Sequence, residues 1–136
     1  GHLAILQYAR RLGCPWDEET CALAARGGHL DCLAWARAGG CPWDGHVCAE
    51  AAAGGHLDVL AWAHEQDAPW GTDTCSAAAG AGQLSALRWC RARSCPWDPS
   101  TILEAMSAGH QDIVQWAEAN GCPWDYESYY PSYYGY

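Results

Sequence analysis

Cysteine, tryptophan and aspartate stand close together in a short motif that recurs along the chain. One copy is Cys41-Pro42-Trp43-Asp44, and Pro-Trp occurs five times at intervals of 27 residues. A thiol, an indole and a carboxylate in one place could hold a metal ion or form a catalytic centre. The tryptophans of the five copies are Trp16, Trp43, Trp70, Trp97 and Trp124.

The repetition argues against a catalytic motif, because an active site is singular and asymmetric. The aspartate also has a simpler role as a helix N-cap, since Asp98 is followed by Pro99, and proline is favoured at the first position of a helix. The sequence has no glycine-rich phosphate loop, nucleophile elbow or Ser/His/Asp arrangement. We therefore predict no catalytic residue, no cofactor and no enzymatic activity.

Metal binding is a second chemical hypothesis, because Cys14, Cys21 and His29 recur from unit to unit. Their spacing is not the Cys-x₂₋₄-Cys of zinc sites, and Ala68 and Gln83 would break the site in the third unit. We expect no metal site and keep a Cys/His metal-binding array as a minor alternative. The recurring histidines are expected to pack and hydrogen-bond in the turns; they include His29, His56 and His110.

The nine cysteines are predicted to be reduced and buried. Cys14 and its counterparts share a repeat position that Ala68 fills in the third unit, so the site requires a small apolar group, which a free thiol supplies. Equivalent positions in adjacent units should lie about 10 Å apart, beyond the reach of a disulfide. We therefore expect a reducing, intracellular and cytoplasmic location, with virion association if the protein is viral.

The fixed period predicts an array of stacked helix pairs. In one unit the first helix is expected from Asp17 to about Arg26 and the second from about His29 to Ala38, each ended by two glycines. Such a pair is too short to fold alone, so the core must lie between neighbouring units. The second helices carry a ladder of aromatic residues that is also expected to be structural: Trp35, Trp62, Trp89 and Trp116.

The array is expected over residues 1–125, and a tyrosine-rich tail over residues 126–136. No polar capping repeat is visible at either end, although solenoids generally need one. We therefore expect a segment of a longer array. The predicted units are a partial repeat 1–13, full repeats 14–40, 41–67, 68–94 and 95–121, and a partial repeat from 122.

The stretch from Thr20 to Leu33 resembles the ankyrin repeat, whose helices open T-P-L-H-x-A-A and continue to G-H-L. Ankyrin repeats run to 33 residues, and Cys-Pro-Trp-Asp stands where their β-turn finger would be. This short variety is similar to ankyrin-like arrays of giant DNA viruses and of some protists and algae, often attached to an F-box, which is not visible here. The resemblance implies an all-α, ankyrin-like helix-turn-helix solenoid with finger-less 27-residue repeats.

Charge and composition indicate the class of partner. The net charge is −9, with arginine but no lysine, which disfavours nucleic acid and anionic membrane surfaces. No apolar run approaches the roughly 18 residues of a membrane span. We therefore expect a protein partner, with no nucleic acid and no membrane.

The solvent-side positions of the first helices, Ala22 and Ala49 among them, differ from unit to unit, and a constant frame with a varying surface is typical of repeat proteins that bind partners. We predict a non-enzymatic protein–protein interaction scaffold that binds along this face. The alternative is a self-assembling protein whose repeats stack end to end into a filament or particle component. The candidate partner-binding residues are Glu18, Glu19, Arg26, His46, Asp73, Ser76, Ser100 and Leu103 on the helices, and Tyr126, Tyr129, Tyr130, Tyr133 and Tyr134 in the tail.

Overall fold

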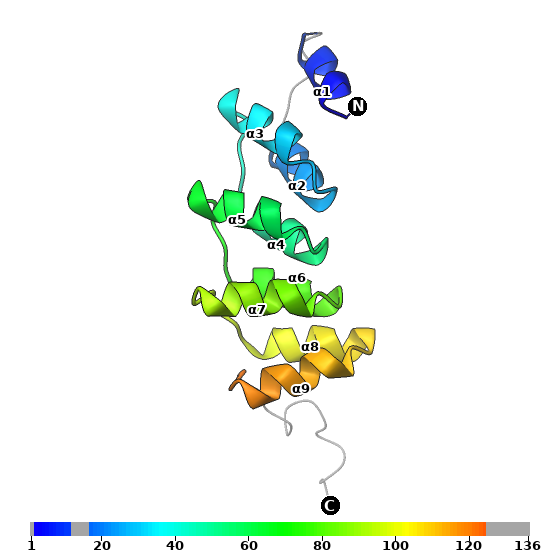
Figure 1. Cartoon of the computed structure of the whole chain (residues 1–136), viewed down its shortest axis with the longest axis vertical. Coiled ribbons are helices and arrows are strands. Elements are labelled where there is room, and N and C mark those ends of the chain that lie inside the picture. Colours follow the sequence, from blue (N-terminus) through cyan, green and yellow to red (C-terminus); the bar gives the residue numbers. More distant parts are fainter. Residues whose placement is uncertain (1, 12–16, 125–136) are drawn as a thin grey trace, which may run out of the picture.

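Helices stacked along one axis make up the part of the chain that the computed structural model describes, residues 2–11 and 17–124, in which no strand occurs (Figure 1). From α2 onward they come in pairs, so the predicted all-α solenoid is confirmed. The helices are α1 His2–Arg11, α2 Glu18–Arg26, α3 Leu30–Ala38, α4 His46–Ala53, α5 Leu57–Glu65, α6 Thr72–Gly80, α7 Leu84–Ala92, α8 Pro99–Ala108 and α9 Gln111–Ala119.

Two of the first helices, α2 and α8, begin at the aspartate that the sequence places as a cap, whereas the N-cap residue is Gly45 in α4 and Gly71 in α6. The Asp17 carboxylate accepts hydrogen bonds from the amides of Glu19 and Thr20, at 3.1 and 3.3 Å. Asp98 accepts a bond of 2.9 Å from the Ser100 amide at the start of α8. These bonds satisfy amides that have no partner inside the helix, so the aspartate of the repeated motif starts a helix.

The turn between the two helices of a pair also contacts a side chain of the next unit. Gly28 has a φ of +73°, and a Cβ at this position would lie 2.7 Å from the His56 ring. The same ring places its Nε2 3.0 Å from the carbonyl oxygen of Arg26. Gly82 and His110 repeat the close approach two units later. Glycine is therefore required twice, for the left-handed backbone and for the contact with the neighbouring imidazole or amide.

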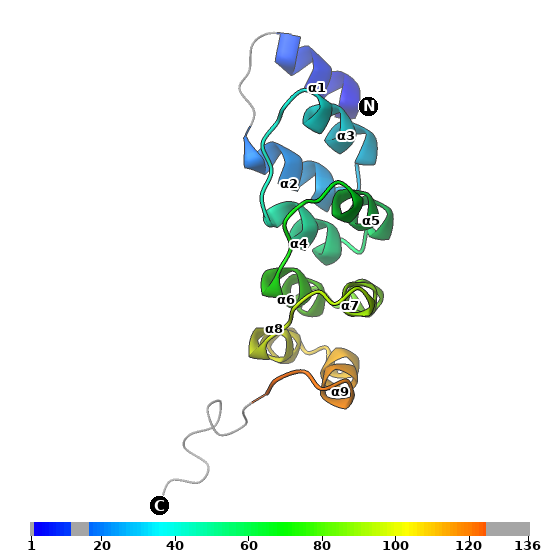
Figure 2. The same cartoon turned by 90° about the vertical axis from the view of Figure 1, so that its left-hand side faces the viewer.

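The helices form two columns that differ in packing (Figure 2). First helices α2, α4, α6 and α8 pack directly on one another, whereas α3, α5, α7 and α9 pack mainly on the first helix of their own pair. Small residues explain the first column, since Ala25, Ala52 and Ala79 are fully buried there and allow helices to approach closely. The second column carries tryptophans, which hold successive second helices farther apart.

The core is a ribbon that runs the length of the array. Leu33 in α3, Leu60 in α5 and Leu87 in α7 are completely buried against the first helices. Cys21, Cys48 and Cys75 occupy the corresponding place on the first helices and are equally buried. Within the described ranges, no helix has the length and apolar character needed to cross a membrane.

Candidate interaction surfaces

The first-helix face has a depression between α2 and α4. Its volume is about 390 Å³, and Leu23 stands beside it with 57% of its surface exposed. Across the depression, Arg26 Nε lies 3.5 Å from Glu50 Oε2, an exposed ion pair that contributes little to stability. The lining residues are Glu19, Ala22, Leu23, Arg26, Asp44, His46 and Glu50.

A second depression lies next to the first, across α4, α6 and α8. Its volume is about 420 Å³, and His46 lines both depressions, so the two are neighbours on one face. Asp73 and Glu104 bring carboxylates to its lining. Ser76 also lines it, and its hydroxyl donates a bond of 3.1 Å to the backbone carbonyl of Asp73.

Carboxylates dominate the electrostatics of this face. Glu19, Asp44, Glu50, Asp73 and Glu104 line the two depressions, against the single arginine of α2. The exposed His46 ring lies 3.0 Å from Asp44 through Nδ1 and Oδ1, and this hydrogen bond raises the pKa of His46 and lowers that of Asp44. The face therefore favours positively charged groups.

The predicted first-helix residues fall into two sets. Glu19, Arg26 and His46 line the first depression, and His46, Asp73 and Ser76 line the second. Ser100 and Leu103 on α8 are half-buried and line neither. The structure thus gathers most of the described candidates on one face. Their role in binding stays a prediction.

The expectation that Ala22 and Ala49 face solvent is wrong. Both are buried, with exposed fractions of 9% and 8%. The close packing of α2 on α4 and of α4 on α6 covers these positions. Some further predictions concern residues or side chains outside the described part of the chain: Cys14, Trp16, the side chain of Glu18, Tyr126, Tyr129, Tyr130, Tyr133 and Tyr134.

The tryptophans lie on the opposite, second-helix side and meet in pairs. Three motif tryptophans contact the tryptophan of the second helix that follows them, in a T-shaped arrangement favoured by the quadrupoles of aromatic rings. The pairs are Trp43–Trp62, Trp70–Trp89 and Trp97–Trp116, with ring centroids 5.9, 6.0 and 5.9 Å apart.

A cation-bearing position accompanies the tryptophan pairs. The guanidinium of Arg37 lies 4.2 Å from the Trp43 ring centroid, and Arg37 Nη1 donates a bond of 2.7 Å to the carbonyl oxygen of Cys41. Arg91 lies over Trp97 in the same way, at 4.3 Å. This contact was not predicted from the sequence, although a recurring signal is present: both arginines precede their tryptophan by six residues.

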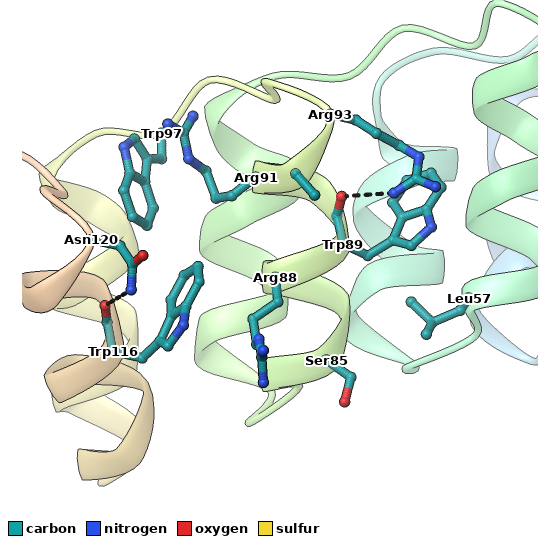
Figure 3. A pocket seen from close by; sticks show the side chains of 10 residues that line it. Leu57, Ser85, Arg88, Trp89, Arg91, Arg93, Trp97, Trp116 and Asn120 are labelled. Carbon is teal, nitrogen blue, oxygen red and sulfur yellow. Dashed lines mark hydrogen bonds between the residues drawn. The ribbon is translucent and has the colours of Figure 1, made fainter.

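A groove between α7 and α9 lies on the second-helix side of the described chain. Its volume is about 650 Å³. Figure 3 shows Arg91 and Trp97 toward one end and Arg93 over Trp89 toward the other, with Arg88 between them. The lining residues are Leu57, Ser85, Arg88, Trp89, Arg91, Ala92, Arg93, Trp97, Trp116 and Asn120.

The cysteines of the described chain are free and buried. One pair is formed by different positions of adjacent units, with Cys21 Sγ 3.3 Å from Cys41 Sγ. Burial raises the pKa of Cys48 and of Cys122 to about 11, which keeps these thiols protonated and unreactive at neutral pH. Among the described residues, no group of three or more His, Cys, Asp or Glu side chains could hold a metal ion.

Comparisons with known proteins place the chain by its fold. No family model matches the sequence, and a search of curated proteins finds no match. A chain in the crystal structure of yeast ribosomal protein Rps3 with its chaperone Yar1 is similar, with a TM-score of 0.60 and 20% identity over 79% of this chain and 96% of that one. Pentatricopeptide repeat protein PPR10, in complex with an 18-nt psaJ RNA element, gives a TM-score of 0.47 and 14% identity over 77% of this chain and 20% of that one. With the geometry above, the first likeness shows that the chain has a helical-repeat fold.

Proposed function

We propose that the chain is a non-enzymatic scaffold that binds another protein along its first-helix face. The observation that carries this proposal is the pair of neighbouring depressions on α2, α4, α6 and α8, which share His46 in their linings. Their linings differ from unit to unit, whereas the residues that cap, turn and pack the helices recur. This division between frame and surface is how repeat proteins build extended binding faces.

The chemistry of the face defines the partner. Carboxylates along both depressions would pair with lysine or arginine of the partner, and Leu23 offers an exposed apolar contact beside them. Interfaces of ordinary size bury roughly 1,600 Å² in total, so the partner would extend over more than one unit. We propose a protein with a basic surface, and neither nucleic acid nor an anionic membrane for this face, because phosphates would meet carboxylates.

A reducing, intracellular environment completes the proposal. Cys21 and Cys41 have their sulfurs 3.3 Å apart inside the core and are not joined in a disulfide. Such a pair is expected to persist as thiols where glutathione and thioredoxin keep cysteines reduced.

Affinity capture with a charge-neutralised face tests the proposal. The bait is the full chain with Glu19→Gln, Asp73→Asn and Glu104→Gln, and proteins captured from a cell extract are quantified by mass spectrometry against the unmodified chain. The matched control neutralises three exposed acids of the second helices, with Asp58→Asn, Glu65→Gln and Glu118→Gln. We expect a partner captured by the unmodified chain to be lost with the first variant and retained with the control. Equal capture by both variants would refute the proposal.

A further inference from the structure

The groove between α7 and α9 combines three guanidiniums with a lining that holds no carboxylate. Arg88 lies in the middle of α7, Arg91 near its end, and Arg93 directly after it. The ion pairs seen in the described chain involve other residues, so none of the three is neutralised there. A cluster of arginines without a carboxylate in the same lining contrasts with the net charge of −9 of the whole chain.

Two of these guanidiniums are held in place by the tryptophans. Arg93 lies 3.9 Å from the Trp89 ring centroid, and its Nη1 donates a bond of 3.4 Å to the Trp89 carbonyl oxygen. Arg91 lies over Trp97 and donates to the carbonyl oxygen of Cys95. A guanidinium stacked on a ring keeps further N–H groups at its edge, so it can still bind a carboxylate in its plane.

We propose that this groove binds an acidic peptide segment of a partner protein, with its carboxylates on Arg88, Arg91 and Arg93. Arginine forms paired hydrogen bonds with carboxylates, and pre-ordered side chains lower the entropic cost of binding. The groove volume of about 650 Å³ accommodates a few side chains. The site lies on the second helices, apart from the first-helix face, so it is tested independently of the proposed function.

Single-stranded RNA fits the same groove less well. Base recognition by such surfaces depends on aromatic rings on which successive bases stack. Here the rings of Trp89 and Trp97 already carry guanidiniums over them.

Fluorescence anisotropy with defined probes tests the proposal on the full chain. The probe is a fluorescein-labelled peptide of alternating glutamate and serine, compared with the same peptide carrying glutamine for glutamate and with a labelled oligouridylate of equal length. We expect only the glutamate peptide to bind appreciably, and added salt to weaken its binding. The variant Arg88→Gln/Arg93→Gln should bind this peptide at least about tenfold more weakly.

Controls separate the groove from general electrostatics and from misfolding. Arg11→Gln removes one positive charge from α1, at the far end of the array (Figure 1). Its affinity for the glutamate peptide should stay within about twofold of that of the unmodified chain. Circular dichroism checks that the double variant keeps its helices, and Arg88→Gln alone tests the arginine that lies between the two stacked ones (Figure 3). The proposal is overturned if the glutamate peptide does not bind, if both groove variants bind it unchanged, or if oligouridylate binds more tightly.

Discussion

The imidazole of His64 stacks on the indole of Trp70, with ring centroids 4.0 Å apart and planes inclined by 25°. Arg37 and Arg91 hold the same position in the units on either side and place guanidiniums over Trp43 and Trp97. The contact therefore joins the end of one second helix to the connector that follows it. In the middle unit an imidazole takes the place of the guanidinium, whose stacking on an aromatic ring is a favourable cation–π contact.

Replacing this histidine with arginine should stabilise the array. In His64→Arg, the new guanidinium can lie over Trp70 and donate to the carbonyl of Ala68, as Arg37 does to that of Cys41. A gain of about 0.5–1 kcal/mol in the free energy of unfolding is expected at neutral pH. Urea denaturation followed by circular dichroism measures it. The reverse exchange, Arg37→His, should lower the same quantity; an unchanged or opposite pair of results would reject the account.

Replacement by valine should change stability differently at two threonines that share one repeat position. Thr74 Oγ1 accepts a bond of 3.2 Å from the Gly71 amide, whereas the Oγ1 of Thr101 is buried without a partner in the described chain. Thr74→Val should cost about 1 kcal/mol, since it leaves an amide without its acceptor. Thr101→Val should be neutral or stabilising, because it removes an unsatisfied hydroxyl. Thermal denaturation of the two variants compares them; equal losses would count against the assigned hydrogen bonds.

The hydrogen bond between His46 and Asp44 should be visible in a pH titration. The bond raises the pKa of His46 above its ordinary 6.5 and lowers that of Asp44 below 3.8. Its stabilising effect is thus lost as pH rises through the raised histidine pKa, and lost again as pH falls through the lowered aspartate pKa. NMR titration of the imidazole should give a pKa above 6.5 that drops in Asp44→Asn. An identical midpoint in both proteins would exclude the pairing in solution.

Alkaline pH should destabilise the core through its thiols. Burial raises the pKa of Cys48 from 9.0 to about 11, so the folded state favours the neutral thiol. Stability from this group is complete below pH 9 and declines as pH rises toward 11, by about 1 kcal/mol at pH 10. Denaturation curves at pH 8 and pH 10 measure the decline. Cys48→Ala should show a smaller decline; the same slope in both proteins would mean that another group is responsible.

The elements of the fold could be predicted because their signals are local and recur. Asp17 and Asp98 cap helices, and Gly28 ends one, through contacts within a few residues. The burial of Ala22 could not be read in this way, because it depends on how closely α2 and α4 approach each other. A solvent-side assignment made on a single helix ignores that neighbour.

The groove between α7 and α9 could not be predicted from the sequence for a different reason. Arg88 has alanine or glutamine at the equivalent position of the described units, and Arg93 has glycine, glutamine or asparagine. Comparison between units emphasises what recurs, so arginines of a single unit are not noticed. Only the packing of α7 beside α9 shows that they line one hollow with Trp89 and Trp97.

Photo-crosslinking tests the central claim, partner binding along the first-helix face, most directly. A photo-reactive amino acid replaces Leu23, which is 57% exposed beside the α2–α4 depression, or Glu65, which is exposed at the end of α5. The chain is irradiated with the partner recovered by affinity capture, and adducts are identified by mass spectrometry. The account predicts an adduct from position 23 and none from position 65. An adduct from position 65 alone would contradict it.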